Sequence, residues 1–303
     1  MRTTIDKTIG TIQFSIPKTA WLYFILLPIF WIDFSTLDSK LLLIASILIC
    51  FTVGLGHSIG LHRGVIHKTF TTSKTVRNIF LYLFVLTGLG SPLHWIKLHY
   101  YRDYWQNRLD CPPYFAYKHS LIRDFWWNLH LQFTANDIKR YNIPKEDLND
   151  KWIIWLHKTW YLHNLLFMVF VYLLSDMNTV LIIVFLRMAI TILGHWFVGF
   201  MTHKYGYARF NIENANESAY NDIILGLFSF GEGFHNNHHA HPNSAKFSLK
   251  WYEIDIGWYL IVLLKKLHLI YNVKEVGIAN TKKQQAKKNN RIIWSFPWKF
   301  KTI

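Results

Sequence analysis

The chain has 303 residues, of which 51% are hydrophobic, and a formal net charge of +15. Its two cysteines, Cys50 and Cys111, exclude a disulfide framework and a thiolate metal site. No nucleic-acid-binding motif accompanies the positive charge, so we expect no nucleic-acid partner and assign the charge to anionic lipid head groups.

Two apolar runs near the N-terminus predict a pair of membrane helices. Residues 21–34 read WLYFILLPIFWIDF, residues 41–56 read LLLIASILICFTVGLG, and only STLDSK separates them. A bilayer core needs roughly 20 apolar residues per helix, which these runs reach when their aromatic flanks are counted. Tryptophan and tyrosine at the ends of the runs are typical of membrane interfaces.

A second pair of apolar runs follows in the C-terminal half. Residues 162–174 and 179–200 are separated by SDMN. The sequence therefore predicts four transmembrane helices in two hairpins. A very hydrophobic soluble helical protein remains the alternative.

Histidines gather near the C-terminal end of the chain. Residues 231–242 read GEGFHNNHHAHP, in which His235, His238 and His239 have the spacing i, i+3, i+4. These positions share one face of an α-helix. Three protonated imidazoles there would repel one another, whereas neutral imidazole is a common metal ligand. The spacing therefore indicates a metal site.

Three further histidine groups lie at the ends of apolar runs, where membrane helices could offer ligands to one shared site. They are His57, His62 and His67; His94 and His99; and His195 and His203. The apolar run 79–93 separates the first two groups, and a spanning helix there would put them on opposite sides. We therefore expect this run to lie at the interface or inside the protein, with Ser91 and Pro92 ending its helix.

Lysine and arginine are abundant around the histidines and in the tail, which predicts a cytoplasmic location for both. We expect an all-α integral membrane protein with a cytoplasmic helical cap that carries a dimetal site. Residues 1–20 would form a cytoplasmic N-terminal segment, 21–275 the membrane domain and 276–303 a basic tail, with both termini in the cytoplasm.

These motifs resemble the membrane fatty-acid desaturases of the acyl-CoA Δ9 type. HRGVIH matches the family's HxxxxH box with His62 and His67, GEGFHNNHHAHP matches its last HxxHH box, and FMTHKYGY matches its lone histidine with His203. The resemblance covers roughly residues 20 to 275. It implies a non-haem di-iron centre, dioxygen as co-substrate and two external electrons, used to introduce a double bond into an acyl chain.

The second histidine box departs from the family pattern. WIKLHYYRDYW supplies His99, but Arg102 and Asp103 stand where the family has two histidines, and Gly199 stands where it has an asparagine. In one interpretation the centre is rebuilt, because Asp103 is at i+4 from His99 and carboxylate binds iron well. In the other, one metal site is weakened or lost. We favour the first.

The resemblance and this interpretation together give a set of expected metal ligands: His62, His67, His99, Asp103, His203, His235, His238 and His239. Additional ligands, or residues that orient the ligands, are expected among His57, His94, His195, Glu232, Asn236, Asn237 and His241.

The expected partners are a fatty acyl substrate (bound to CoA, carrier protein or lipid), membrane lipids and a separate electron donor such as a ferredoxin or a cytochrome b5-like protein. We expect the bacterial inner membrane, or the endoplasmic reticulum if the source is eukaryotic. A lipid hydroxylase or other oxygenase with the same metals, and a catalytically silent membrane protein that binds metal or lipid, remain alternatives.

Overall fold

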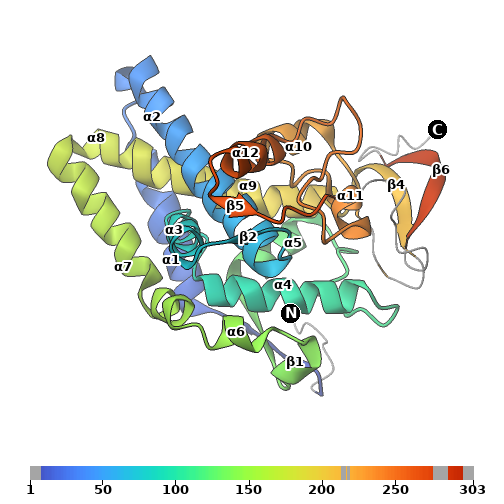
Figure 1. Cartoon of the computed structure of the whole chain (residues 1–303). Helices are drawn as coiled ribbons and strands as arrows, with labels where there is room; N and C mark the ends of the chain where they lie inside the picture. Colours follow the sequence, from blue (N-terminus) through green and yellow to red (C-terminus); the bar gives the residue numbers. More distant parts are fainter. Residues whose placement is uncertain (1–7, 213–215, 217–218, 276–285, 296–303) are drawn as a thin grey trace, which may run out of the picture.

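Helices make up most of the structure (Figure 1), a computed structural model that describes residues 8–212, 216, 219–275 and 286–295. The first long helix joins α2 (Ser39–Ile49) to the π-helix η3 (Cys50–Ile66) without a break. It begins at Asp38, whose side chain accepts a hydrogen bond from the Leu41 amide at 2.7 Å, as helix N-caps do. With 28 residues, it is long and apolar enough to cross a membrane.

The second long helix has the same character. It joins α8 (Met177–Val180), the π-helix η5 (Leu181–Leu186) and α9 (Arg187–Thr202) into one stretch of 26 residues. Asp176 caps it by accepting from the Thr179 amide at 2.9 Å. Two of the four predicted membrane segments are therefore confirmed as helices capable of spanning.

The other two predicted segments are helical, but neither is both long enough and apolar enough to count as a membrane-spanning helix. The first consists of α1 (Ile16–Leu26) and the 3₁₀ turns η1 (Leu27–Trp31) and η2 (Phe34–Thr36), and is shorter. The other is α7 (Lys151–Leu174), which has 24 residues but carries lysine and histidine in its first half. The four-span arrangement therefore stays a prediction.

The predicted end of the helix within 79–93 is wrong. Helix α3 (Lys74–Val85) ends earlier, and the chain then turns through Gly88 and Gly90, whose φ angles are 79° and 108°. Ser91 and Pro92 instead begin the next helix: the Ser91 hydroxyl accepts from the His94 amide at 3.2 Å. Proline is favoured at the first helical position because its fixed φ suits a helix and its missing N–H is not needed there.

Helix α3 packs one face against the protein, whereas Ile79 on its other side is exposed, so its location at the interface or in the interior stays a prediction. Phe80, Leu81 and Phe84 on it are almost inaccessible to solvent, and they pack against η3. At Gly56 a Cβ atom would lie 2.4 Å from the Phe84 amide nitrogen. The two helices can therefore approach this closely only because Gly56 has no side chain.

The remaining helices cover the ends of the two long ones in Figure 1. They are α4 (Pro92–Gln106), α5 (Leu121–His130), η4 (Ile138–Tyr141), α6 (Lys145–Leu148), α10 (Ile223–Phe228), α11 (His235–Ala240) and α12 (Ile256–Lys266).

Within the part of the chain that the structure describes, three two-stranded antiparallel sheets correct the expectation of an all-α chain. The pairs are β1 (Gly10–Phe14) with β3 (Leu131–Ala135), β2 (Thr71–Thr72) with β5 (Ile270–Tyr271), and β4 (Gly206–Ile212) with β6 (Ala286–Ser295). Their main-chain hydrogen bonds tie three segments to the rest of the protein: the N-terminal segment through β1, the chain after α12 through β5, and the tail through β6. Strand β6 belongs to the expected basic tail, of which 276–285 and 296–303 lie outside the described residues.

Candidate metal centre

The first group of imidazoles comes from three parts of the chain. His62 lies in η3 and His67 just after it, His99 lies in α4 and His238 in α11. One potential ligand atom from each falls within 4.8 Å of the others. The Nε2 atoms of His62 and His67 are 3.2 Å apart.

A second group lies beside the first. It consists of His203, which follows α9, together with His235 and His239 of α11, again with ligand atoms within 4.8 Å of one another. The Nε2 atom of His235 lies 3.1 Å from that of His203 and 3.0 Å from that of His239. Between them the two groups contain all seven histidines predicted as ligands.

Helix α11 contributes to both groups. His235 and His239, one turn apart, join the second group, whereas His238 turns toward the first. The ring centroids of His238 and His239 are 5.5 Å apart, so the two groups are neighbours. The sequence predicts one shared metal-binding face for these three histidines. In the structure His238 belongs to the first group, whereas His235 and His239 belong to the second.

The nitrogen separations fit metal ions. Imidazole nitrogens bound at about 2.1 Å to one ion lie roughly 3.0–3.4 Å apart at tetrahedral or octahedral angles. The three Nε2 pairs have separations of 3.0–3.2 Å. A proton on His235 Nε2 could form a good hydrogen bond to only one of its two neighbours, the Nε2 atoms of His203 and His239. A metal cation could accept the lone pairs of all three nitrogens.

Glu232 contacts the first group. Its Oε2 lies 2.7 Å from Nδ1 of His62, and its Oε1 accepts from the Ser58 hydroxyl at 2.6 Å. A carboxylate at Nδ1 favours the tautomer in which that nitrogen carries the proton, leaving the Nε2 lone pair for a metal. Burial raises the pKa of Glu232 to about 7, although the Arg63 guanidinium opposes this.

His67 and His238 of the first group favour the neutral form. Burial, reinforced by the neighbouring His99, lowers the pKa of His67 to about 3. Burial also lowers the pKa of His238 well below its ordinary value, with His67 adding to the effect. Neutral imidazoles are the form that binds metals.

Asp103 belongs to neither group of ligand atoms, but it contacts the first group. Its Oδ2 is 3.2 Å from Nδ1 of His99. Burial would raise the pKa of Asp103, yet His99, with smaller effects from His67 and His239, lowers it to about 2. The carboxylate therefore carries its negative charge close to histidines of both groups.

An apolar cavity of about 330 Å³ lies against both groups. His62 and His99 of the first group line it, as do all three histidines of the second. Its apolar walls come from the two long helices and from α4 and α10, with Ile49, Val53, Leu61, Trp95, Ile190, Phe197 and Phe228 among the lining residues. This volume is within the usual range for small-molecule sites.

The four other candidate histidines lie outside both groups. His57 and His195 pack edge to face with ring centroids 4.7 Å apart and line the large cavity. His94 lines two smaller cavities beside it. His241 packs on Phe210, with centroids 4.9 Å apart.

Asn236 and Asn237 anchor α11 instead of touching the imidazoles. The Asn236 side chain accepts from the main-chain amides of Arg209 and Phe210, at 2.7 and 2.8 Å. That of Asn237 donates to Glu253 Oε2 at 3.2 Å, and Glu253 pairs with the Arg209 guanidinium at 2.7 Å. Sequence reasoning missed this buried Arg209–Glu253 pair, for which the sequence gives no signal.

Tyr117 is a second residue that sequence reasoning missed. Its ring stacks on His203 with centroids 4.1 Å apart and an angle of 14° between the planes. Its φ of 49° is unusual for a residue other than glycine, and such strain tends to persist where the surroundings enforce it. A Cβ atom on Gly199 would lie 3.9 Å from the Tyr117 hydroxyl, so the tyrosine faces the position where the desaturase pattern has asparagine.

Comparisons with known proteins agree with this geometry. Residues 40–269 match the family model described as "Fatty acid desaturase". The chain is 30% identical over 244 residues to the sn-1 stearoyl-lipid 9-desaturase of Synechocystis sp., covering 78% of this chain and 73% of that protein.

Two further relatives show the range of the similarity. The sn-2 palmitoyl-lipid 9-desaturase of Nostoc sp. is 31% identical over 225 residues, covering 72% of this chain and 76% of that protein. The icosanoyl-CoA 5-desaturase of Limnanthes douglasii is 28% identical over 267 residues, covering 85% and 68%. The chain belongs to the fatty acid desaturase family, and it is a membrane-associated fatty acyl desaturase.

Proposed function

We propose that this chain uses dioxygen and two external electrons to introduce a double bond into a long acyl chain held in the large cavity. The observation that carries the proposal is the meeting of seven histidines from distant segments in two adjacent groups at the wall of an apolar cavity. Oxidation of an unactivated alkyl chain requires metal ligands beside an apolar space that holds the chain.

Two irons would be held by the two groups. The first group would hold one ion and the second group the other, with the Asp103 carboxylate beside His99 as a further ligand. Bound iron would supply the redox chemistry that removes two hydrogens from the alkyl chain as dioxygen is reduced to water. The donor set of nitrogen and carboxylate without thiolate suits iron.

The protein's own part is to orient and to exclude water. Glu232 holds the proton of His62 on Nδ1, and Tyr117 restrains the His203 ring by stacking on it. The apolar walls of the cavity would hold the acyl chain and keep bulk water from the reactive centre.

The directions of the long helices support four membrane spans. His62 lies near the C-terminal end of Ser39–Ile66 and His203 directly follows Met177–Thr202. Because these ends meet, the two helices run the same way, and the chain must recross the membrane between them, for which α7 is the available helix. The Asp33 amide donates to the Asn178 side chain at 2.8 Å, so the turns of both proposed hairpins lie together at the opposite end.

We place the metal centre and both termini on the cytoplasmic side, since lysine and arginine are abundant around the histidines. The inner membrane of a bacterium, or the endoplasmic reticulum of a eukaryote, would suit this orientation. An acidic electron donor such as a ferredoxin or a cytochrome b5-like protein would be steered to a basic face.

The test is expression of the full chain in a host without a desaturase of its own. Fatty-acid profiles and iron per purified chain are measured for the wild type, for His238→Ala, and for His241→Ala, which alters the residue that ends the same short helix but joins neither group. We expect a new double bond and about two irons in the wild type and in His241→Ala, and loss of both the double bond and at least one iron in His238→Ala.

Other outcomes separate the alternatives. A hydroxylated product in place of an alkene would show a hydroxylase that uses the same ligands. A chain purified anaerobically without iron, from a host whose lipids are unchanged, would show a silent protein and contradict the proposal.

A further inference from the structure

The large cavity reaches the surface of the protein along one side. Three of the residues that line it are also exposed: Phe228 of α10 is 78% exposed, and Ile190 and Phe197 of α9 are 53% and 39% exposed. Gly194, which also lines the cavity, lies between these two on the same face of α9. A Cβ atom on Gly194 would meet no other part of the described structure within 4 Å. The cavity therefore has an opening bordered by α9 and α10.

This opening lies along a helix that is long and apolar enough to cross a membrane. The α9 residues of the opening belong to the stretch Met177–Thr202, and Ile49 and Val53 of the other such stretch, Ser39–Ile66, line the same cavity. At about 1.5 Å per residue, Ile190 lies about 18 Å along the helix from its end at Thr202. A bilayer core is about 30 Å thick, so the opening extends from the metal end to the level of the bilayer's middle.

The charged residues of the cavity wall lie away from this opening. They are Arg102, Asp103 and Glu232, of which Asp103 and Glu232 contact ligand histidines at 3.2 and 2.7 Å. All three exposed residues of the described lining are apolar. A charged head group passing here would lose water without gaining polar partners, which is costly, whereas an alkyl chain needs only apolar contact. The opening therefore suits a hydrocarbon chain that comes from lipid.

Two helices beside the opening expose apolar faces of their own. Ile224 of α10 is exposed, as are Tyr259 and Leu263, one turn apart on α12. The two helices are neighbours, because a Cβ atom on Gly257 in the first turn of α12 would lie 2.4 Å from the main-chain oxygen of Phe230, just after α10. Exposed apolar helix faces of this kind are typical of membrane contact. A lipid beside the opening would have its head group at the level of these helices.

We propose that the large cavity opens sideways into the bilayer between α9 and α10, and that it takes one acyl chain of an intact membrane glycerolipid. The head group of that lipid stays at the membrane surface beside α10 and α12. This inference rests on the proposed function, because it assumes that the large cavity holds the acyl substrate. It names the substrate class as a lipid ester already in the membrane, in place of a thioester delivered from water.

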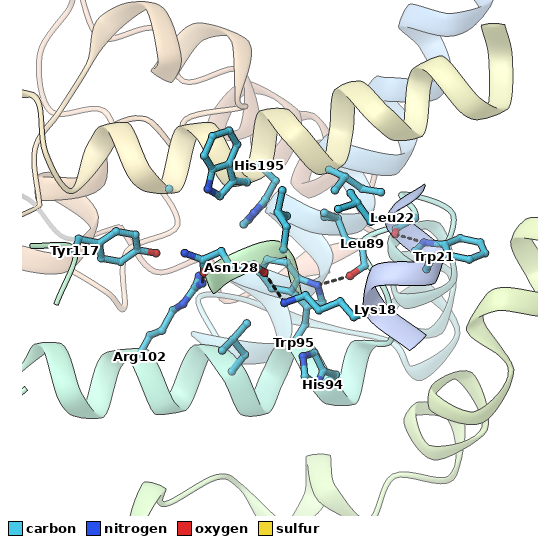
Figure 2. Close-up of a pocket in the computed structure, with 16 residues that line it drawn as sticks. Lys18, Trp21, Leu22, Leu89, His94, Trp95, Arg102, Tyr117, Asn128 and His195 are labelled. Atoms are coloured by element: carbon cyan, nitrogen blue, oxygen red, sulfur yellow. Dashed lines mark hydrogen bonds between the residues drawn. The ribbon is translucent and has the colours of Figure 1, made fainter. Parts of the chain in front are cut away.

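Trp95 can report whether an acyl chain has entered. It lies on α4, its indole N–H donates to the Leu89 main-chain oxygen at 2.9 Å, and its ring packs on His195 with centroids 4.5 Å apart. Trp95 lines both the large cavity and a smaller one of about 110 Å³, and Figure 2 shows it with His195 in the space between α4 and α9. Lipid outside the protein does not reach this position, so a chain that modifies Trp95 must lie in the cavity.

The test uses the purified full-length protein with its metals as isolated, reconstituted without dioxygen in vesicles of diphytanoyl phosphatidylglycerol. The vesicles contain a tracer phosphatidylglycerol with a diazirine near the middle of one saturated chain. After irradiation, mass spectrometry compares labelling of Trp95 with that of Leu43, an exposed residue of α2 that bilayer lipid reaches in any case. We expect labelling of both residues. Labelling of Leu43 alone overturns the inference.

Three variants locate the opening. Gly194→Trp should close it and remove most of the labelling of Trp95 relative to Leu43. Leu173→Trp is the matched control, since it adds the same side chain at an exposed position of α7 that is not part of the described cavity lining, and it should leave the ratio unchanged. Phe228→Ala should widen the opening and raise the ratio, with little loss of stability because Phe228 is mostly exposed.

Thermal unfolding and metal content show whether each variant is folded. If Gly194→Trp does not fold, Phe228→Ala decides the outcome. A labelling ratio that stays at the wild-type value in every folded variant overturns the assignment of the opening.

A coenzyme A ester with the same photoreactive chain, added from the aqueous side, tests the other source of acyl chains. Labelling of Trp95 by the ester but not by the lipid would identify a soluble acyl donor and overturn the inference. Labelling by the lipid that is lost in Gly194→Trp supports it whatever the ester does, because the chain of an intact lipid comes from the bilayer.

The outcome for this inference is independent of that for the proposed function, because labelling requires no turnover. Entry of a lipid chain into a protein that produces no double bond would overturn the proposed function alone. Double-bond formation without labelling of Trp95 by the lipid would overturn this inference alone.

Discussion

The Oε2 atom of Glu232 lies 2.7 Å from Nδ1 of His62, in the first group of histidines. Glu232 is held in turn by the Ser58 hydroxyl at 2.6 Å. The relationship joins the last histidine box of the sequence to the first, and it is the type of support that fixes the tautomer of a metal-binding imidazole.

Glu232→Gln should weaken iron binding without removing a ligand. The amide keeps the shape of the side chain and loses the charge that favours a proton on His62 Nδ1, and such changes typically lower metal affinity about 10–100-fold. Iron retained after graded chelation measures the effect. Glu146→Gln, at an exposed carboxylate paired with Lys68, should be neutral; equal iron retention in both variants would contradict the assigned role.

Asp103→Ala should lower iron per chain toward one and sharply reduce double-bond formation, because the carboxylate lies close to histidines of both groups. Asp103→His restores the family pattern and should keep the iron. The control is Asp110→Ala, at an exposed aspartate paired with Arg108 at 3.0 Å. If Asp103→Ala leaves iron content and activity at wild-type levels, the rebuilt second box is wrong.

Gly199 and Gly56 should respond in opposite ways to alanine. A Cβ on Gly199 meets only the Tyr117 hydroxyl, at 3.9 Å, whereas one on Gly56 would lie 2.4 Å from the Phe84 nitrogen. Gly199→Ala should therefore be tolerated and could gain up to about 1 kcal/mol of helix stability. Gly56→Ala should separate η3 from α3 and lower the unfolding temperature markedly; thermal unfolding in detergent compares the two.

Gly199→Leu tests the part of the large cavity beside Tyr117. The leucine would extend into the cavity there, so we expect turnover of the acyl substrate to fall with little loss of stability. Unchanged turnover together with an intact fold would show that the substrate does not pass this point.

Removal of metal should lower the unfolding temperature. The two groups tie η3, α4, α9 and α11 together. A metal ion whose free concentration is about a thousand times its Kd stabilises the folded state by about 4 kcal/mol. Unfolding curves before and after anaerobic chelation measure the change, and re-addition of ferrous iron should reverse it. Identical curves would show that the groups do not hold metal.

Spacing and position relative to the apolar runs were enough to predict which histidines meet. His62, His99, His203 and His238 come together because each lies at the end of a helix or in a cap helix packed against those ends. The sequence could not show that His238 would separate from His235 and His239, since all three positions lie on one side of a short helix.

Other features depend on tertiary contacts that leave no local pattern. The Arg209–Glu253 pair holds α11 through residues far apart in the chain, and Tyr117 reaches His203 from a loop. Ser91 and Pro92 were misassigned because proline both discourages the preceding residue from helical geometry and favours the start of a helix. Only the capping contact to His94 decides between these effects.

Helix α11 has six residues and serves two ligand groups at once. A rotation of this helix that improves the position of His238 must also move His235 and His239. Occupation of one group therefore preorganises the other, so the two ions should load cooperatively, and half-filled protein should be scarce during titration with ferrous iron.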